Sequence, residues 1–199
     1  LHHLLRRQRQ MCIRDRQSID KFGGSARYSR IVGAIDDSDT SITRNTTALR
    51  MRKDIEIVAD TPASYEICFE QALDNNAQSP VVASTGFTIK GPTNLQSSYT
   101  LYFEDDTNGK LLLYRINDEG VKVYQDDIDF GTVDYATGEL MMGYTDAVTF
   151  TSTLLPGKEI QVRAVPLGQD IVAKKSVYLE LDIENSKIDA VVDREIQNQ

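Results

Sequence analysis

The chain has 199 residues and a formal net charge of −8, so it is long enough for one domain or two small ones with a substantial core. Its acidity argues against non-specific binding of nucleic acid, which requires clustered Lys and Arg. No run of the sequence approaches the roughly 18 to 20 apolar residues that cross a bilayer. We therefore expect a soluble protein that contacts neither nucleic acid nor membrane.

The first sixteen residues, LHHLLRRQRQMCIRDR, differ from the rest because they hold five Arg, one Asp, both His and Cys12. The string MCIRDR resembles the translated read-through of a sequencing adapter, so we interpret residues 1–16 as an artefact. A short basic helical arm is the alternative. Without this stretch the chain carries a net charge of −12, no His and a single Cys, Cys68. That remainder cannot form an internal disulfide, a Cys/His zinc site or a His-activated nucleophile.

Residues 17–97 have a mixed α/β character. Apolar residues from Tyr28 to Ile35 recur at the helical i, i+3, i+4, i+7 spacing, with Ile31 and Val32 between them, which predicts one short amphipathic helix. The helix should stop at Asp36–Asp39, because Asp and Ser prefer turns. Strands are expected at 65–69 and within the apolar stretch 81–89.

A basic stripe lies between these elements. Residues 42–53 indicate an extended, Thr-rich segment in which Arg44, Arg50 and Arg52 share one face. Two interpretations stay open. The arginines form ion pairs with neighbouring Asp and Glu, or they form a contact surface for an acidic partner.

Residues 98–183 predict an antiparallel β region. The stretch Ser98–Tyr144 alternates with a period of two and contains three turn signals. A two-residue turn is expected at Asn108-Gly109, and further reversals are expected at residues 118–120 and at Thr137-Gly138. The result is a meander or two consecutive hairpins, with strand 110–116 at its centre.

Two more strands follow, at 160–164 and at 177–183, and the second has the cleanest alternation in the chain. Pro166 should end the first of them, because proline cannot donate to a ladder. Residues 184–199 form a polar C-terminal tail. The predicted fold class is therefore α+β and β-rich, with antiparallel hairpins and one short N-terminal amphipathic helix.

Carboxylates are the main groups left for catalysis. The candidate acids are Glu104, Asp105, Asp106, Asp126, Asp127 and Asp129. They lie in predicted turns, where Asp and Asn are favoured because their side chains bond to the backbone. We therefore predict no catalytic, cofactor-binding or metal-binding residue. Two oxygen-rich clusters, 36–39 and 106–109, lack the EF-hand pattern, although a calcium loop of another type stays open. Cys68 is expected to be an inert buried thiol. The nine tyrosines suit cross-strand packing or a contact surface.

Five blocks of the sequence resemble a known protein family, and this resemblance indicates more about function than the residue types do. It is carried by residues 22–55 (FGGSARYSRIVGAIDDSDTSITRNTTALRMRKDI), by ASTGF at 83–87, YTLYFEDD at 99–106, GTVDYATGEL at 131–140 and VYLELD at 177–182. In this order, the blocks resemble the C-terminal part of the inner-ring baseplate wedge protein of contractile-tailed, T-even-type bacteriophages. The long N-terminal portion of that family is missing, which fits a truncated gene prediction.

The resemblance implies a non-enzymatic virion protein, assembled in the bacterial host cytoplasm. Such subunits dimerise, join other wedge proteins and close into a ring that transmits host attachment to the tail sheath. We also expect strand edges that promote association of the isolated chain. A receptor- or glycan-binding module of a phage tail is the alternative, and a concave cluster of Tyr with Asp or Asn would be its mark.

Overall fold

The structure is a computed structural model that describes residues 25–76, 80–90, 99–143, 148–150, 159–172, 178–179, 186–187 and 189. This part of the chain is β-rich, with antiparallel sheets and a single helix, which confirms the coarse fold class. The predicted artefact at 1–16, the ends of the ladder at Ser98 and Tyr144, the strand residues Leu181 and Ile183 and most of the tail lie outside the described residues.

The main sheet contains ten strands, and every pairing in it is antiparallel. Its order is β15, β2, β13, β5, β7, β8, β10, β11 and β4, with β9 paired to β8 alone. In this order, β2, β5 and β4, which precede residue 98, are interspersed with strands that follow it. The bounds are β2 Met51–Glu56, β4 Tyr65–Cys68, β5 Val82–Ser84, β7 Leu101–Asp105, β8 Lys110–Ile116, β9 Lys122–Tyr124, β10 Gly131–Asp134, β11 Glu139–Met142, β13 Glu159–Ala164 and β15 Tyr178–Leu179.

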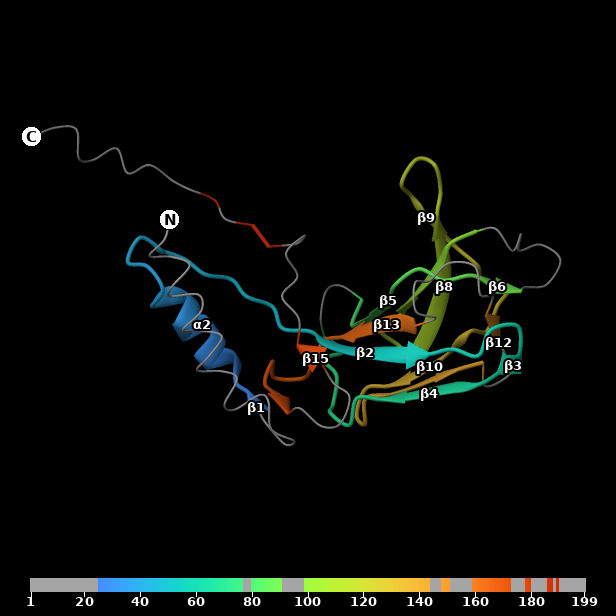
Figure 1. Cartoon of the computed structure of the whole chain (residues 1–199), viewed down its shortest axis with the longest axis horizontal. Coiled ribbons are helices and arrows are strands. Elements are labelled where there is room, and N and C mark those ends of the chain that lie inside the picture. Colours follow the sequence, from blue (N-terminus) through green and yellow to red (C-terminus); the bar gives the residue numbers. More distant parts are fainter. Residues whose placement is uncertain are drawn as a thin grey trace, which may run out of the picture.

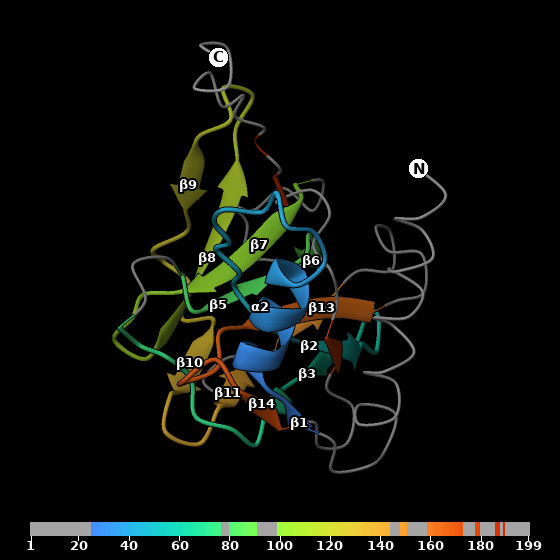
Figure 2. The same ribbon diagram turned by 90° about the vertical axis from the view of Figure 1, so that its left-hand side faces the viewer.

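Two small sheets and the helix complete the described structure. One sheet joins β3 (Pro62–Ala63), β12 (Val148–Phe150) and β6 (Ile89–Lys90), and the other joins β1 (Ser25–Ala26) to β14 (Ile171–Val172). Helix α2 (Tyr28–Asp36) follows β1 and lies off one end of the main sheet (Figures 1 and 2). Asp170, next to β14, accepts a hydrogen bond from the first helical N–H through its Oδ1 (2.9 Å).

The helix begins and ends where its sequence pattern predicted. Tyr28 and Ile31 pack against the core, yet no residue of α2 is fully buried. Its amphipathic character therefore stays a prediction. The chain leaves the helix at Asp37 and Ser38, whose N–H groups donate to the carbonyls of Gly33 and Ile35.

The predicted ladder is present, with a correction at its first turn. β7, β8 and β9 form a meander, β10 and β11 form a hairpin, and β8 has the predicted bounds. The first reversal is longer than two residues, because Asp106 N–H bonds to the carbonyl of Lys110 and positive φ falls at Thr107 and Gly109. The Asp106 carboxylate holds this longer loop by accepting from the N–H groups of Asn108 and Lys110.

Only the end of the expected extended segment at 42–53 pairs as a strand. Its ladder begins only at Met51 and runs to Glu56, opposite β13. The pairing with β13 ends at Ala164, the partner of Met51, and residues 42–50 have no neighbouring strand among the described residues.

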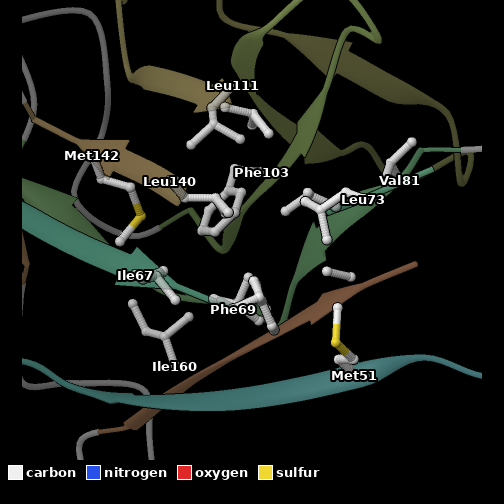
Figure 3. Close-up of a cluster of buried hydrophobic side chains, with 14 of the residues drawn as sticks. Met51, Ile67, Phe69, Leu73, Val81, Phe103, Leu111, Leu140, Met142 and Ile160 are labelled. Atoms are coloured by element: carbon white, nitrogen blue, oxygen red, sulfur yellow. The ribbon is translucent and has the colours of Figure 1, made fainter. Parts of the chain in front are cut away.

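One hydrophobic core lies on the inner face of the main sheet. Phe103, Leu140, Met142 and Ile160 are fully buried in it, and the labelled side chains of β2, β4, β7, β8, β11 and β13 converge there (Figure 3). The sheet is strongly curled, because β2 and β4 lie far apart in the strand order but run side by side (Figure 1). Lys53 of β2 crosses this seam, since its Nζ donates to the backbone oxygen of Cys68 in β4 (2.5 Å).

Candidate interaction surfaces

A row of three tyrosines crosses the outer face of β7, β8 and β9. Tyr102, Tyr114 and Tyr124 are directly opposite one another in the ladder. The first two rings are stacked with centroids 5.5 Å apart and an interplanar angle of 22°, and the next pair is 5.8 Å apart at 55°. Strand pairing alone places these rings together, because directly opposite residues project on the same side of a sheet.

A charged pair is built into the same face. Glu104 of β7 is only 5% exposed, and its carboxylate accepts from Lys122 Nζ (2.5 Å) and from the Tyr124 hydroxyl (2.6 Å). The Lys122 ammonium also lies 4.7 Å from the centre of the Tyr114 ring, within reach of a cation–π interaction. Burial and the Glu104 charge raise the pKa of Tyr114 to about 12. The hydrogen bond to Glu104 raises the pKa of Tyr124.

This arrangement favours protein contact over sugar stacking. A platform for a sugar needs an exposed ring face, but Tyr102 and Tyr114 turn their faces toward each other. Beside the row, the hairpin of β8 and β9 projects from the body of the protein (Figure 1) and exposes Ile116, Val121 and Tyr124 at 49%, 53% and 40%. Exposed apolar side chains on a projecting element are typical of a protein-binding surface.

Asp105 is a second buried acid, next to Glu104 in β7. It is 5% exposed and points to the inner face of β7, opposite Glu104, because neighbouring residues of a strand alternate. Its carboxylate accepts from Val82 N–H (2.7 Å), Thr107 N–H (3.2 Å) and the Tyr135 hydroxyl (2.8 Å). Burial and this bond raise the pKa of Tyr135. Both acids therefore hold structure, on opposite sides of the strand.

The remaining acids predicted as candidates are not brought together. Asp106 holds its own turn, whereas Asp126, Asp127 and Asp129 are exposed. No group of three or more His, Cys, Asp or Glu side chains suited to a metal occurs among the described residues. At the other oxygen-rich cluster, one Asp39 oxygen accepts from Ser41 N–H. Cys68, predicted as an inert buried thiol, is a free cysteine that is partly buried.

A shallow hollow lies between the β7–β8 and β10–β11 turns. Asn75, Asn108, Asp134 and Tyr135 contribute to its lining, which is the combination expected of a glycan site. However, the Tyr135 hydroxyl is bound to Asp105, and one Asp134 oxygen accepts from Ala136 N–H (2.9 Å). A hydrogen bond from the Thr137 side chain also lowers the pKa of Asp134. The polar groups of the hollow are thus largely engaged in holding its two turns.

The basic stripe divides into paired and unpaired arginines. Arg52 Nη2 donates to Asp54 Oδ2 (2.9 Å), and its Nε lies 2.9 Å from the other carboxylate oxygen. Arg44 and Arg50 are exposed, and neither forms an ion pair with a described residue. Within the described part of the chain, the ion-pair interpretation thus holds for Arg52, and the contact interpretation stays open for the other two.

Sequence reasoning missed Lys53 and Lys122. Lys53 lies among inward-facing residues of β2, and nothing in its spacing shows that it reaches Cys68. Lys122 could have been found, because the predicted reversal at 118–120 brings the residues after it back beside strand 110–116, which in turn pairs with the strand that carries Glu104.

Comparison with known proteins identifies one matching family. Residues 13–54 match the family model of the baseplate structural protein gp6, C-terminal domain III. The matched range includes α2, the unpaired segment 42–50 and most of β2, and it begins inside the stretch interpreted as an artefact. No curated protein matches the chain. The family match confirms the resemblance to a baseplate wedge protein over these residues and supports a structural role in a phage baseplate. No helix in the described part of the chain is long and apolar enough to cross a membrane.

Proposed function

We propose that this chain is a structural subunit of a bacteriophage tail baseplate wedge. In this role it assembles through protein contacts, with a second copy and with other wedge proteins, into the ring that couples host attachment to sheath contraction. The match of residues 13–54 to a baseplate domain carries the proposal. The chain acts in the virion, after assembly in the bacterial host cytoplasm, and it has no enzymatic activity.

The geometry supports a scaffolding role in two ways. The buried acids Glu104 and Asp105 accept hydrogen bonds from backbone N–H and tyrosine O–H groups of other strands and turns, which ties these parts of the sheet together. The projecting β8–β9 hairpin offers exposed apolar side chains to neighbours. A stable subunit contact buries about 1,200 Å² or more, and a hairpin arm together with the tyrosine row supplies a continuous surface for such a contact.

The alternative function is a receptor- or glycan-binding module of a phage tail. It is favoured by the hollow that combines Tyr135 with Asp134 and two asparagines. The two functions predict different positions in the particle, because a receptor-binding module lies where it can touch the cell.

Cross-linking and mass spectrometry of intact virions would test the proposal. We expect peptides of this chain to be cross-linked to other baseplate proteins, and the purified chain to bind no sugar on a glycan array. Cross-links only to tail fibres, together with sugar binding abolished by Tyr135→Ala, would contradict the baseplate function and support the alternative.

A further inference from the structure

Residues 43–50 form a bare edge in the described structure. They run as an extended stretch from the helix turn into β2 (Figure 1), and no backbone hydrogen bond joins them to another described residue. The hydrogen bonds that these residues form with described residues come from side chains, from Asn45 to the carbonyl of Val32 and from Thr47 to Asn45. An unpaired extended segment is a ready template for another strand.

β15 pairs with the start of β2, so its pairing would continue along residues 43–50 if the strand were longer. Tyr178 is opposite Arg52 and Leu179 is opposite Met51, in antiparallel orientation. Because an antiparallel ladder keeps its register, its continuation would place Glu180, Leu181, Asp182, Ile183 and Glu184 opposite Arg50, Leu49, Ala48, Thr47 and Thr46, respectively.

The two segments are complementary on both faces in this register. Glu180, Asp182 and Glu184 would share a face with the unpaired Arg44 and Arg50. On the other face, the apolar side chains of residues 181 and 183 would extend the row of Met51 and Leu49, which are 0% and 7% exposed. A shift of one residue would exchange the two faces and set carboxylates against the core.

We propose that residues 180–184 of this same chain dock on residues 46–50 and continue β15. The acidic partner of the basic stripe is then the chain's own C-terminal strand. Direct continuity with β15 gives these residues a high effective concentration at the edge, which favours them over a second copy. The pairing ties the C-terminal region to the segment that matches the baseplate domain, and it does not depend on the proposed function.

Disulfide trapping in the full-length chain tests this pairing. Arg50→Cys is combined with Glu180→Cys after Cys12 and Cys68 are replaced by Ala. Opposite residues in an antiparallel pair lie about 4.5 to 5.5 Å apart at Cα, which is within the range that a disulfide spans. We expect an intramolecular disulfide, seen as a faster-migrating monomer on a non-reducing gel.

Two matched pairs serve as controls. Arg52→Cys with Tyr178→Cys joins a register that the structure shows and should form the disulfide. Arg50→Cys with Leu181→Cys places the thiols on opposite faces and should not. If the Arg52–Tyr178 pair closes and the Arg50–Glu180 pair does not, the proposal is wrong. A disulfide that forms only between two chains would assign the edge to a second copy and would also overturn it.

A charge-reversal cycle tests the same contact without a covalent bond. Arg50→Glu and Glu180→Arg should each lower Tm by about 1 to 3 °C, the effect of a single surface pair in a chain of this size. The double variant should recover most of that loss. Additive losses in the double variant would show that the two side chains do not meet.

Discussion

Asp105 holds three separate parts of the chain through one carboxylate. It binds the start of β5 through Val82 N–H, the β7–β8 turn through Thr107 N–H and the β10–β11 turn through the Tyr135 hydroxyl. A buried charge is tolerated only when it is well bonded, and these three donors meet that condition. The residue therefore has a structural explanation that requires no chemistry.

The contrast between Asp105→Ala and Tyr135→Phe measures this role. Asp105→Ala leaves a buried N–H and a hydroxyl without an acceptor, so it should lower the free energy of unfolding by about 3 kcal/mol. Tyr135→Phe removes only one donor and should cost about 1 kcal/mol. Urea denaturation gives both values, and the exposed Glu119→Gln serves as a control with little effect. Equal losses for Asp105→Ala and Tyr135→Phe would contradict the three-donor explanation.

Because of Tyr114, the free energy of unfolding should depend on pH in the alkaline range. Its pKa is raised from 10.0 to about 12 in the folded state, so folding favours the neutral phenol. This contribution is fully present below pH 10 and is lost as the pH rises toward 12. The free energy of unfolding should fall across that window, and the fall should be shallower in Tyr114→Phe. An identical slope in the variant would show that Tyr114 does not contribute.

At the scale of secondary-structure elements, two glycines differ in whether the backbone leaves room for a side chain. Gly138 in the β10–β11 turn has φ +73°, and a Cβ there would lie 2.2 Å from the backbone oxygen of Gln71. Gly33 in α2 has open space, because a Cβ there would meet nothing within 4 Å. The same substitution should thus have opposite effects at the two sites.

Gly138→Ala should lower stability by about 3 kcal/mol, through positive φ and a backbone clash. Gly33→Ala should raise it by about 0.5 to 1 kcal/mol, because alanine is the better residue inside a helix. Thermal denaturation of the two variants beside the parent chain checks both signs. A destabilising Gly33→Ala would mean that the helix needs this glycine for a contact outside the described residues.

The elements that the sequence predicted well are those defined by local pattern. The helix at Tyr28–Asp36 and the strand at Lys110–Ile116 follow from spacing and turn residues within a few positions. The β7–β8 turn was wrong because the Asp106 side chain supports a longer loop, and hairpin signals do not include that option. The sequence predicted an extended segment over 42–53 but not where its pairing begins, because that depends on where β13 ends, in a distant part of the chain.

The same limit applies to the candidate surfaces. The alternation of Tyr102 and Tyr114 predicted that tyrosines lie on strand faces, and the structure adds that they stack directly across β7 and β8. The hollow beside Tyr135 joins Asn75 to a turn more than thirty residues further along the chain. No local pattern in the sequence reports such a distant contact.

At the scale of the whole molecule, Lys53 stabilises the contact between β2 and β4 that closes the curled sheet. Its ammonium bonds to the Cys68 carbonyl across the gap between β2 and β4, and an inward-pointing charge also discourages foreign strands from pairing there. Lys53→Met should cost about 1 kcal/mol of stability and speed amide hydrogen exchange in β2 and β4. Lys110→Met, at an exposed position, is the matched control. Unchanged exchange in β2 and β4 would show that the seam does not rely on Lys53.

The β8–β9 hairpin should dominate association of the isolated chain. It projects from the body (Figure 1) and exposes Ile116 and Val121 on the two sides of its turn. We expect light scattering to show association at high concentration, and Ile116→Thr with Val121→Thr to delay its onset, because threonine keeps β propensity while reducing apolar surface. Val58→Thr, which changes a 58% exposed side chain elsewhere, should leave the onset unchanged. A parent chain that stays monomeric at high concentration would contradict the predicted association. Equal effects of all variants would mean that general hydrophobicity, and not the hairpin, drives association.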